Sequence, residues 1–366
     1  MRVLFAGGGT GGHINPALSI ANYIKEKDDN FEALFVGTKR GLETKLVPKA
    51  GYDIEYIDIQ GFDRKNMLKN VKVLKKLIES RKKCKQIIKS FKPDMVVCTG
   101  GYVSGPVLMA AHKMGVPSVI HEQNVYPGLT VKGSEKYVNY VLVSFPETVN
   151  HMKNKEKCVV TGNPIREEIL KQNPQTAKLE LELDQRPFVL IFGGSLGAQK
   201  INENVVKILP KLIEDNKIQL LFGTGERNYD EIIKELEGVE IPSNIKIVPY
   251  IDNMQTVMAA ADLVVSRAGA ITVSEIAALG KASILIPSPN VVRNHQEQNA
   301  REFEKAGAAA LICESELTSD VLYNKINELT KDKAVLETMG KNVKKLAKLD
   351  ALEEIYKVIL KCIKNN

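Results

Sequence analysis

Short apolar runs alternate along the chain with longer segments whose apolar residues recur at helical spacing. Uninterrupted apolar runs are typical of strands buried on both faces, so the pattern predicts parallel sheets covered by helices on both sides. In the first half the predicted strands are residues 3–6, 33–36, 95–98, 118–120 and 140–143. In the second half they are residues 189–192, 219–222, 245–248, 263–265 and 283–286. From residue 331 onward, lysine, leucine and glutamate at helical spacing predict helix.

The two halves of the chain repeat one arrangement. The apolar run and paired glycines at residues 3–8 return at residues 189–194, and small residues and a predicted helix follow each copy. A chain of 366 residues is too long for one typical hydrophobic core, so two domains are expected. We therefore predict an α/β protein with two Rossmann-like units, whose ligands lie at the carboxyl ends of the strands, in a cleft between the facing units.

Composition narrows the class of protein. Hydrophobic residues make up 44% of the chain and charged residues 26%, which is typical of a globular protein and not of disorder. Its five cysteines follow neither a CxxC nor a zinc-binding spacing, so we expect free thiols in a reducing cytoplasm. We find no signal-peptide pattern and no apolar stretch long enough to span a bilayer. Neither a DxD motif nor a metal-spaced cluster occurs, so we expect no protein-held metal and no cofactor.

The glycine-rich stretch at residues 7–13 lies between a predicted strand and a predicted helix. Glycines let backbone N–H groups approach a ligand, and a helix N-terminus favours negative charge, so a phosphate-sized anion fits here. The spacing also matches GxGxxG, but a dinucleotide site needs an acidic residue after the second strand, and residues 37–40 carry none. His13 adds a side chain that titrates near neutral pH. The alternatives are a glycine turn that only packs helix on strand, and a histidine that only bonds at the helix start.

Further polar stretches follow other predicted strands, at residues 100–106, 121–124, 266–275 and 295–299. Such positions belong on the ligand-facing rim of a parallel sheet. Backbone N–H groups around residues 270–272 suit a pyrophosphate, Glu275 can accept hydrogen bonds from a ribose diol, and the amides at 295–299 suit sugar hydroxyls. Arg166 or Arg267 can stabilise a leaving diphosphate. Ordinary loop polarity and helix capping by Ser274 or Glu275 are the alternatives.

Residues 64–92 combine apolar residues at helical spacing with many lysines and arginines and few acids. A basic amphipathic segment suits an anionic membrane surface, with about 1 kcal/mol gained per well-placed basic residue. A nucleic-acid surface is disfavoured because stacking aromatics are missing, and a helix with a solvated lysine face is the remaining alternative. The lysines that we expect to dock on the membrane are Lys72, Lys75, Lys76, Lys82 and Lys83.

Taken together, these stretches resemble the MurG family of bacterial peptidoglycan synthesis. The matching segments are GGGTGGHINPAL (7–18), GGYVSGP (100–106), HEQN with PGLT (121–130), TGNPIR (161–166), GGSLGAQ (193–199), SRAGAITVSEIAALG (266–280) and HQEQNA (295–300). They occur in family order over nearly the whole chain. One position departs: Val131 stands where the family usually has asparagine, so a role of that amide is absent or shifted here.

The resemblance implies a GT-B architecture with an acceptor- and membrane-side domain at residues 1–163, a UDP-sugar domain at 164–345, and a C-terminal helix at 346–366 that packs back on the first domain. It implies inverting transfer of N-acetylglucosamine from UDP-N-acetylglucosamine to the 4-hydroxyl of undecaprenyl-pyrophosphoryl-N-acetylmuramoyl-pentapeptide, which converts lipid I to lipid II. The expected location is the cytoplasmic face of the cell membrane, as a peripheral protein on the anionic inner surface. Other cell-wall synthesis proteins are further expected partners, and nucleic acid is not.

The resemblance also assigns site residues. Contacts to the donor are implied for Thr10, Gly11, Gly12, Asn124, Arg166, Ser195, Ile251, Ala270, Ile271, Thr272, Val273, Ser274, Glu275 and Gln296. Among them Glu275 takes the ribose, and the backbone of Ile251 takes the uracil. We expect His13 to be the catalytic base, with Glu122 as second candidate and His121 shaping the site. Three other functions are weighed against this one: a UDP-N-acetylglucosamine 2-epimerase of the same architecture, a non-catalytic nucleotide-sugar sensor, and a dehydrogenase.

Overall fold

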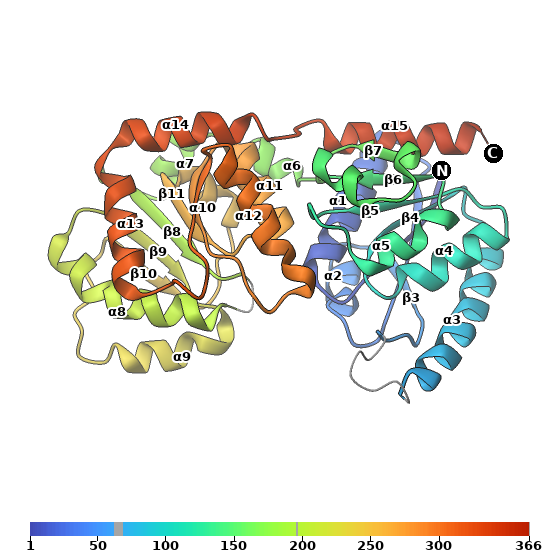
Figure 1. The fold of residues 1–366 in the computed structure, drawn as a ribbon, viewed down its shortest axis with the longest axis horizontal. Helices are drawn as coiled ribbons and strands as arrows, with labels where there is room; N and C mark the ends of the chain where they lie inside the picture. Colours follow the sequence, from blue (N-terminus) through green and yellow to red (C-terminus); the bar gives the residue numbers. More distant parts are fainter. Residues whose placement is uncertain (62–68, 195–196, 366) are drawn as a thin grey trace. The chain divides into compact units, whose positions relative to one another are not determined.

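The computed structural model describes residues 1–61, 69–194 and 197–365. They form two compact units (Figure 1). The first comprises Met1–Ile165 together with Lys348–Asn366, and the second comprises Arg166–Ala347. Each unit is a parallel sheet with helices packed on both of its faces.

The first unit is built on a seven-stranded sheet with the order β3-β2-β1-β4-β5-β6-β7. Its strands are β1 (Arg2–Gly7), β2 (Glu32–Gly37), β3 (Asp53–Tyr56), β4 (Met95–Gly100), β5 (Ser118–Glu122), β6 (Tyr140–Val143) and β7 (Cys158–Val160). Its α-helices are α1 (Gly11–Lys27), α2 (Glu43–Lys49), α3 (Lys69–Phe91), α4 (Ser104–Lys113), α5 (Leu129–Ser134) and α15 (Ala351–Lys364). Short 3-10 helices are η1 (Glu135–Tyr137), η2 (Pro146–His151) and η3 (Lys155–Lys157).

Side chains of β1 alternate between two apolar layers of this unit. Val3 and Phe5 pack with α1 and α15, whereas Leu4 and Ala6 pack with α3 and α4. Both layers are fully buried at β1, as expected for a central parallel strand. Helix α15 therefore completes the core of the first unit, although it follows the second unit in the sequence.

The second unit is built on a six-stranded sheet with the order β10-β9-β8-β11-β12-β13. Its strands are β8 (Phe188–Phe192), β9 (Gln219–Gly223), β10 (Ile245–Val248), β11 (Leu263–Ser266), β12 (Ala282–Leu285) and β13 (Ala309–Leu311). Its helices are α6 (Glu167–Leu170), α7 (Pro174–Glu180), α8 (Gln199–Asp215), α9 (Glu226–Glu235), α10 (Met254–Ala260), α11 (Ala270–Leu279), η4 (Val292–Asn294), α12 (His295–Lys305), α13 (Ser319–Lys331) and α14 (Lys333–Lys344).

Both sheets reverse their strand order at one point. In the first unit the reversal lies between β1 and β4, and in the second it lies between β8 and β11. At such a switch point the helices that follow neighbouring strands leave toward opposite faces, which opens a crevice at the carboxyl ends of the strands. The glycine-rich loops that follow β1 and β8 stand at these two switch points, so the fold gives each unit one place where a ligand is expected.

Every strand predicted from the sequence is present, and each end lies within two residues of its predicted position. The prediction missed three strands, β3, β7 and β13, which lie at the edges of the two sheets. The helical region expected from residue 331 contains two helices, α14 and α15, which residues 345–350 separate. Among the described residues, no helix is both long enough and apolar enough to cross a membrane.

Candidate active site

The glycine loop of the first unit leads from β1 into α1. Gly9 has a φ of 89°, a conformation that side chains disfavour, and the Thr10 carbonyl accepts the His13 and Ile14 N–H groups as the helix begins. A Cβ at Gly7 would lie 2.2 Å from Thr99 Oγ1, so the loop packs too closely for any other residue there. Thr10 and Gly12 are exposed at this helix start, where partial positive charge favours an anion.

Glu43, at the start of α2, fixes the shape of this loop. Its side chain is fully buried, and one carboxylate oxygen accepts a hydrogen bond from Gly9 N at 2.9 Å. The other oxygen accepts from both the backbone N–H and the hydroxyl of Thr38, each at 2.9 Å. Glu43 was not among the predicted site residues, because a carboxylate was expected only directly after the second strand, at residues 37–40. Its side chain packs closely against Gly37 and Gly41, and this contact exists only in the fold.

His13 stands at the end of the glycine loop with a defined orientation. Its Nδ1 lies 3.2 Å from the Gly8 carbonyl oxygen. Because a carbonyl oxygen only accepts, Nδ1 carries the proton, and the lone pair of the neutral ring lies on Nε2. A Cβ at Gly100 would lie 2.9 Å from that Nε2, so the ring rests on the bare backbone of the loop after β4. Thr99 Oγ1 also donates to the His13 carbonyl at 2.6 Å. The half-buried imidazole is therefore held in one place with one tautomer.

The polar residues at the end of β5 divide into two roles. His121 is fully buried, its Nε2 donates to the Gly162 carbonyl at 2.9 Å, and burial lowers its pKa to about 4. Gln123 Nε2 lies 3.1 Å from His121 Nδ1 and 2.9 Å from the Thr99 carbonyl oxygen. These side chains are bonded inside the unit at neutral pH, so they support the rim and do not line it.

Glu122 is almost fully buried, and backbone groups occupy both of its oxygens. Asn124 donates to Oε1 from its backbone and side-chain nitrogens, at 2.9 and 3.0 Å, and Gly128 N donates to Oε2 at 2.7 Å. Burial raises the pKa of this carboxyl, while these hydrogen bonds oppose the rise. Through these hydrogen bonds Glu122 holds residues 124–128 in place and positions half-buried Asn124 at the rim. Val131, on α5, lies in the apolar core, so it offers no polar group to a ligand.

In the second unit α11 begins at the switch point, directly after β11. Gly269 is the residue before the helix, and its carbonyl accepts the Val273 N–H at 2.9 Å as the first helical bond. The first turn, which contains Ala270, Ile271 and Thr272, presents the positive end of the helix. Ser274 and Val273 follow on the same helix, Ser274 half-buried and Val273 fully buried.

Glu275, one turn further along α11, is 7% exposed. Arg166 Nη2 lies 3.3 Å from Glu275 Oε1. Among the residues that the structure describes, Glu275 forms an ion pair with Arg166 and with no other cation. Burial raises the pKa of Glu275, and the Arg166 charge opposes the rise. A buried carboxylate with a single partner at 3.3 Å retains hydrogen-bonding capacity that a ligand with two hydroxyls can use.

The other loops at this edge are held from within. Arg267 Nη1 donates to the Ile286 and Pro287 carbonyls at 3.1 and 3.3 Å, and its guanidinium also pairs with Glu314. The Ser288 N–H donates to Gln296 Oε1 at 2.9 Å. Arg267 is thereby turned into the protein, so of the two arginines weighed for a leaving group, exposed Arg166 is the better placed.

A further predicted position, Ile251, and the described part of the loop after β8 lie near the carboxyl ends of β8 to β10. Ile251 follows β10, is 7% exposed, and packs toward Gly223 at the end of β9. Gly194 and Gly197 have φ values of 97° and 76°, so the loop after β8 uses conformations that favour glycine. Ser195 falls outside the described residues.

Two apolar residues of the amphipathic pattern predicted over residues 64–92 are exposed on α3. Leu74 and Ile78 are 53% and 52% exposed, one helical turn apart. Lys75 and Lys82 lie exposed on the same helix. Lys75 Nζ lies 4.0 Å from Glu79, and Lys76 pairs with Asp58 at 2.9 Å. Another predicted lysine of this helix, Lys83, lies 3.5 Å from Glu55. The side chain of Lys72 falls outside what the structure describes.

Two Rossmann-like parallel sheets, each with a glycine-rich loop and a helix start at its switch point, define the class of GT-B glycosyltransferases. The chain matches the model of the glycosyltransferase family 28 N-terminal domain over residues 3–143 and that of the C-terminal domain over residues 188–355. It belongs to the MurG family of glycosyltransferases.

The curated relatives match it from end to end. One from Acetivibrio thermocellus is 48% identical over 366 residues, which cover 100% of this chain and 99% of the relative. Another, from Ruminiclostridium cellulolyticum, is 47% identical over 365 residues, which cover 99% of this chain and 100% of the relative. Both are named UDP-N-acetylglucosamine--N-acetylmuramyl-(pentapeptide) pyrophosphoryl-undecaprenol N-acetylglucosamine transferase.

Solved structures agree with the fold. The crystal structure of Acinetobacter baumannii MurG superposes with a TM-score of 0.79 at 29% identity, covering 98% of this chain and 99% of that one. A UDP-GlcNAc 2-epimerase from Neisseria meningitidis gives a TM-score of 0.68 at 14% identity, covering 99% of this chain and 100% of that one. At that identity the epimerase shares the fold alone.

Proposed function

We propose that this protein transfers N-acetylglucosamine from UDP-N-acetylglucosamine to the 4-hydroxyl of the muramyl sugar of lipid I, with inversion, to give lipid II. The observation that carries the proposal is the 48% identity over the whole chain to a relative named for this transfer. The positions of His13 and Glu275 at the two switch points support it, because a transferase needs a base for its acceptor and a holder for its nucleotide.

The second unit is proposed to hold the donor. The start of α11 receives the diphosphate, since helix N–H groups and the helix dipole favour it. Glu275 accepts hydrogen bonds from the ribose hydroxyls, and the backbone of Ile251 contacts the uracil. Arg166 neutralises charge that develops on the departing diphosphate. The remaining proposed donor contacts are Ala270, Ile271, Thr272, Val273, Ser274, Gln296 and Ser195.

The first unit is proposed to supply the base and the rest of the sugar-end contacts. Thr10, Gly11, Gly12 and Asn124 contact the sugar and diphosphate. His13 Nε2 takes the proton of the acceptor hydroxyl while that oxygen forms its bond to the anomeric carbon. The bond from this carbon to the diphosphate breaks on the opposite face, and its electron pair leaves with UDP. Proton removal of this kind contributes about 10²–10⁴ in rate.

Transfer of radiolabel from UDP-N-acetylglucosamine to a short-chain lipid I analogue tests this proposal, with UDP-glucose as the matched donor control. We expect labelled product from the first donor and little from the second. Formation of UDP-N-acetylmannosamine without acceptor would instead support an epimerase. Donor binding with no turnover in either assay would support a nucleotide-sugar sensor.

We further propose that the protein docks on the anionic cytoplasmic surface of the cell membrane through α3. Leu74 and Ile78 insert among the head groups, while Lys75 and Lys82 contact anionic lipid. Reversing both charges, by Lys75→Glu with Lys82→Glu, removes about 1 kcal/mol per lysine and repels the lipid. Sedimentation with phosphatidylglycerol vesicles should fall sharply, while turnover of a short-chain acceptor stays unchanged. Unaltered sedimentation would contradict docking through α3.

A further inference from the structure

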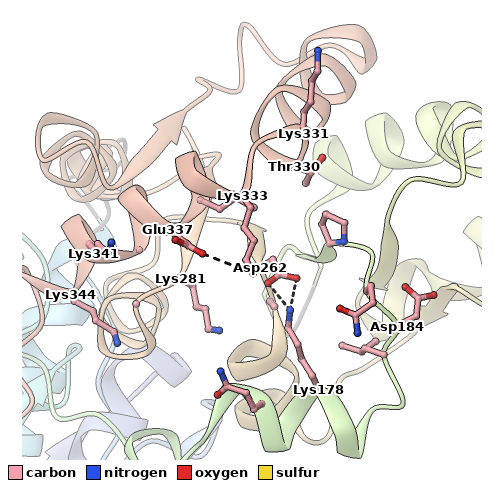
Figure 2. A pocket seen from close by; sticks show the side chains of 18 of the residues that line it. Lys178, Asp184, Asp262, Lys281, Thr330, Lys331, Lys333, Glu337, Lys341 and Lys344 are labelled. Atoms are coloured by element: carbon pink, nitrogen blue, oxygen red, sulfur yellow. Dashed lines mark hydrogen bonds and ion pairs between the residues drawn. The ribbon is translucent and has the colours of Figure 1, made fainter.

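A pocket of about 830 Å³ opens in the second unit away from the residues proposed to bind the donor (Figure 2). Pro187, Asp262 and Lys281, which line it, each directly precede a strand, namely β8, β11 and β12. These three strands are neighbours in the sheet and are parallel. The pocket therefore lies at the amino ends of the strands whose carboxyl ends carry the proposed donor site, so the two sites are at opposite edges of one sheet.

Lysines dominate the lining of this pocket. They come from α7, from the turn before β12, from the end of α13 and from α14, and they are Lys178, Lys281, Lys331, Lys333, Lys341 and Lys344. The lining acids are Asp184, Asp262 and Glu337. The pocket thus gathers an excess of positive charge from segments far apart in the sequence.

The acids of the pocket are already engaged. Asp262 accepts two hydrogen bonds from Lys178 Nζ, at 2.7 and 2.8 Å (Figure 2). It accepts a third from Phe188 N at 2.9 Å. Glu337 lies 4.0 Å from Lys333 on the same helix, and Asp184 pairs with Arg186. Within the described part of the chain no ion pair joins the other lining lysines to a carboxylate. They are Lys281, Lys331, Lys341 and Lys344.

Lys281 is the most informative of these side chains. It is 8% exposed and donates to the Ala259 carbonyl of α10. The pKa of Lys281 is lowered to about 8, mainly by burial; the Asp262 charge opposes this shift, and the charges of Lys178 and Lys344 contribute to it. The buried Lys281 ammonium lies near two other cations and near one carboxylate, Asp262, that already bonds to Lys178. An anion in the pocket would offset this excess of positive charge.

The wall beside Lys281 is tightly built. A Cβ at Gly340 would lie 2.6 Å from the Gly280 carbonyl oxygen, so α14 touches the turn before β12 directly. A Cβ at Gly280 would lie 2.3 Å from Lys344 Cε, which places the stem of Lys344 over this turn. The close contact of these two glycines brings α14 against the turn before β12, so the stem of exposed Lys344 lies beside the pocket.

We infer that this pocket is a second anion site, which binds a small phosphorylated compound at the edge of the sheet opposite the donor. Its volume falls within the range of about 300–1,000 Å³ that is usual for small-molecule sites. Lysine ammonium groups are strong partners for phosphate oxygens. The apolar lining residues Leu183, Pro187 and Leu336 leave room for a non-polar portion of the ligand.

Calorimetric titration with sodium pyrophosphate tests this inference on the full chain. Saturating UDP is present throughout to fill the proposed donor site. The pocket variant is Lys341→Gln with Lys344→Gln, two exposed positions where the substitution removes charge and keeps most of the side-chain stem. The matched control is Lys207→Gln with Lys246→Gln, which removes the same charge from exposed positions outside the pocket.

We expect one pyrophosphate to bind the wild-type chain, with affinity reduced about tenfold or more in the pocket variant because two charge-assisted contacts are lost. The control should stay within about twofold, since exposed charges act weakly at a distance in salt. Amide resonances of Gly280 and Gly340 should shift during the titration in the wild-type chain. This readout is specific to the pocket, so it remains valid even if the proposed transfer reaction is not found.

A vesicle arm distinguishes free phosphate compounds from lipid head groups. If sedimentation with phosphatidylglycerol vesicles also falls in the pocket variant, the phosphate belongs to a lipid. If it is unchanged while pyrophosphate binding is lost, the ligand is a free compound. Equal weakening in the pocket and control variants, or a titration without heat and without shifts at Gly280 and Gly340, would overturn the inference.

Discussion

In the first unit the buried carboxylates of Glu43 and Glu122 have both of their oxygens bonded to nearby N–H and hydroxyl groups. In the second unit the buried carboxylate of Glu275 meets one arginine nitrogen at 3.3 Å. All three lie at or after the carboxyl end of a strand in a parallel sheet. A buried carboxylate whose hydrogen bonds are complete shapes a loop, whereas one with remaining capacity is available to a ligand.

The same distinction separates the histidines of the first unit. His121 is fully buried, bonded through both ring nitrogens, and kept neutral by burial, which lowers its pKa to about 4. His13 is half-buried, and its Nδ1 bond to Gly8 leaves the basic lone pair on Nε2. Completed bonding inside the unit thus identifies His121 as a supporting residue, whereas half-buried His13 lies at the rim with its Nδ1 toward the Gly8 carbonyl.

The largest effect is expected for His13→Ala. Loss of the base should lower turnover about 10²–10⁴-fold, while the affinity for UDP-N-acetylglucosamine, measured by calorimetry, changes little. His112→Ala, at an exposed position of α4, is the control and should retain wild-type turnover. Turnover of His13→Ala within a few-fold of wild type, with donor still bound, would show that His13 is not the base.

A smaller effect on catalysis is expected for Glu275→Gln, and it should change the KM for donor more than kcat. A hydrogen bond from a ribose hydroxyl to a charged group is worth about 1.5–3 kcal/mol, so the KM for donor should rise about 10- to 100-fold with kcat less affected. Glu231→Gln, exposed on α9, is the matched control. An unchanged KM would place the ribose elsewhere.

The thermal stability of Glu275→Gln tests separately whether the Glu275 carboxylate differs from those of Glu43 and Glu122. Burial raises the pKa of Glu275, so its carboxyl stabilises the fold at acid pH and this contribution is lost as the pH rises through the folded-state pKa. Removing the charge should therefore raise the melting temperature at pH 7.5, and the difference should vanish near pH 4. A variant that melts lower at pH 7.5 would indicate that the carboxylate is structural, like Glu43.

Glu43→Gln should show the behaviour of a completed carboxylate. One amide end of glutamine cannot accept, so the part-buried N–H of Gly9 or of Thr38 loses its partner, at a cost of about 1–3 kcal/mol in the free energy of unfolding. Urea unfolding measures this loss, and Glu26→Gln, exposed on α1, should be neutral. The glycine loop carries His13, so turnover should also fall. Wild-type stability in Glu43→Gln would contradict its role in holding the loop.

The sequence predicted the central strands of both sheets because they are buried on both faces and appear as continuous apolar runs. Three edge strands were not predicted because their sequences do not form continuous apolar runs of sufficient length. Strand β3 alternates polar and apolar residues, and β7 and β13 have only three residues each. Short strands at an edge depend on their neighbours in the sheet for their existence, and that information is not local in the sequence.

The candidate site was predictable where it follows strand ends, as at His13 and Glu275, because parallel strands bring their carboxyl ends to one edge. The hydrogen bonds and ion pairs that distinguish supporting residues from ligand-facing ones could not be predicted. Arg267 turns inward only because Glu314 and the Pro287 carbonyl lie beside it in the fold. The buried environment of Lys281 likewise depends on residues that are distant along the chain.

The product of the reaction tests the central claim most directly. Incubation of the full chain with UDP-N-acetylglucosamine and a short-chain lipid I analogue should give one disaccharide product, analysed by proton NMR. The account predicts a β-linked N-acetylglucosamine on the 4-hydroxyl of the muramyl sugar, released with an equal amount of UDP, because attack occurs on the face opposite the leaving group. An α-linked product, or conversion of the donor to UDP-N-acetylmannosamine with the acceptor left unmodified, would contradict it.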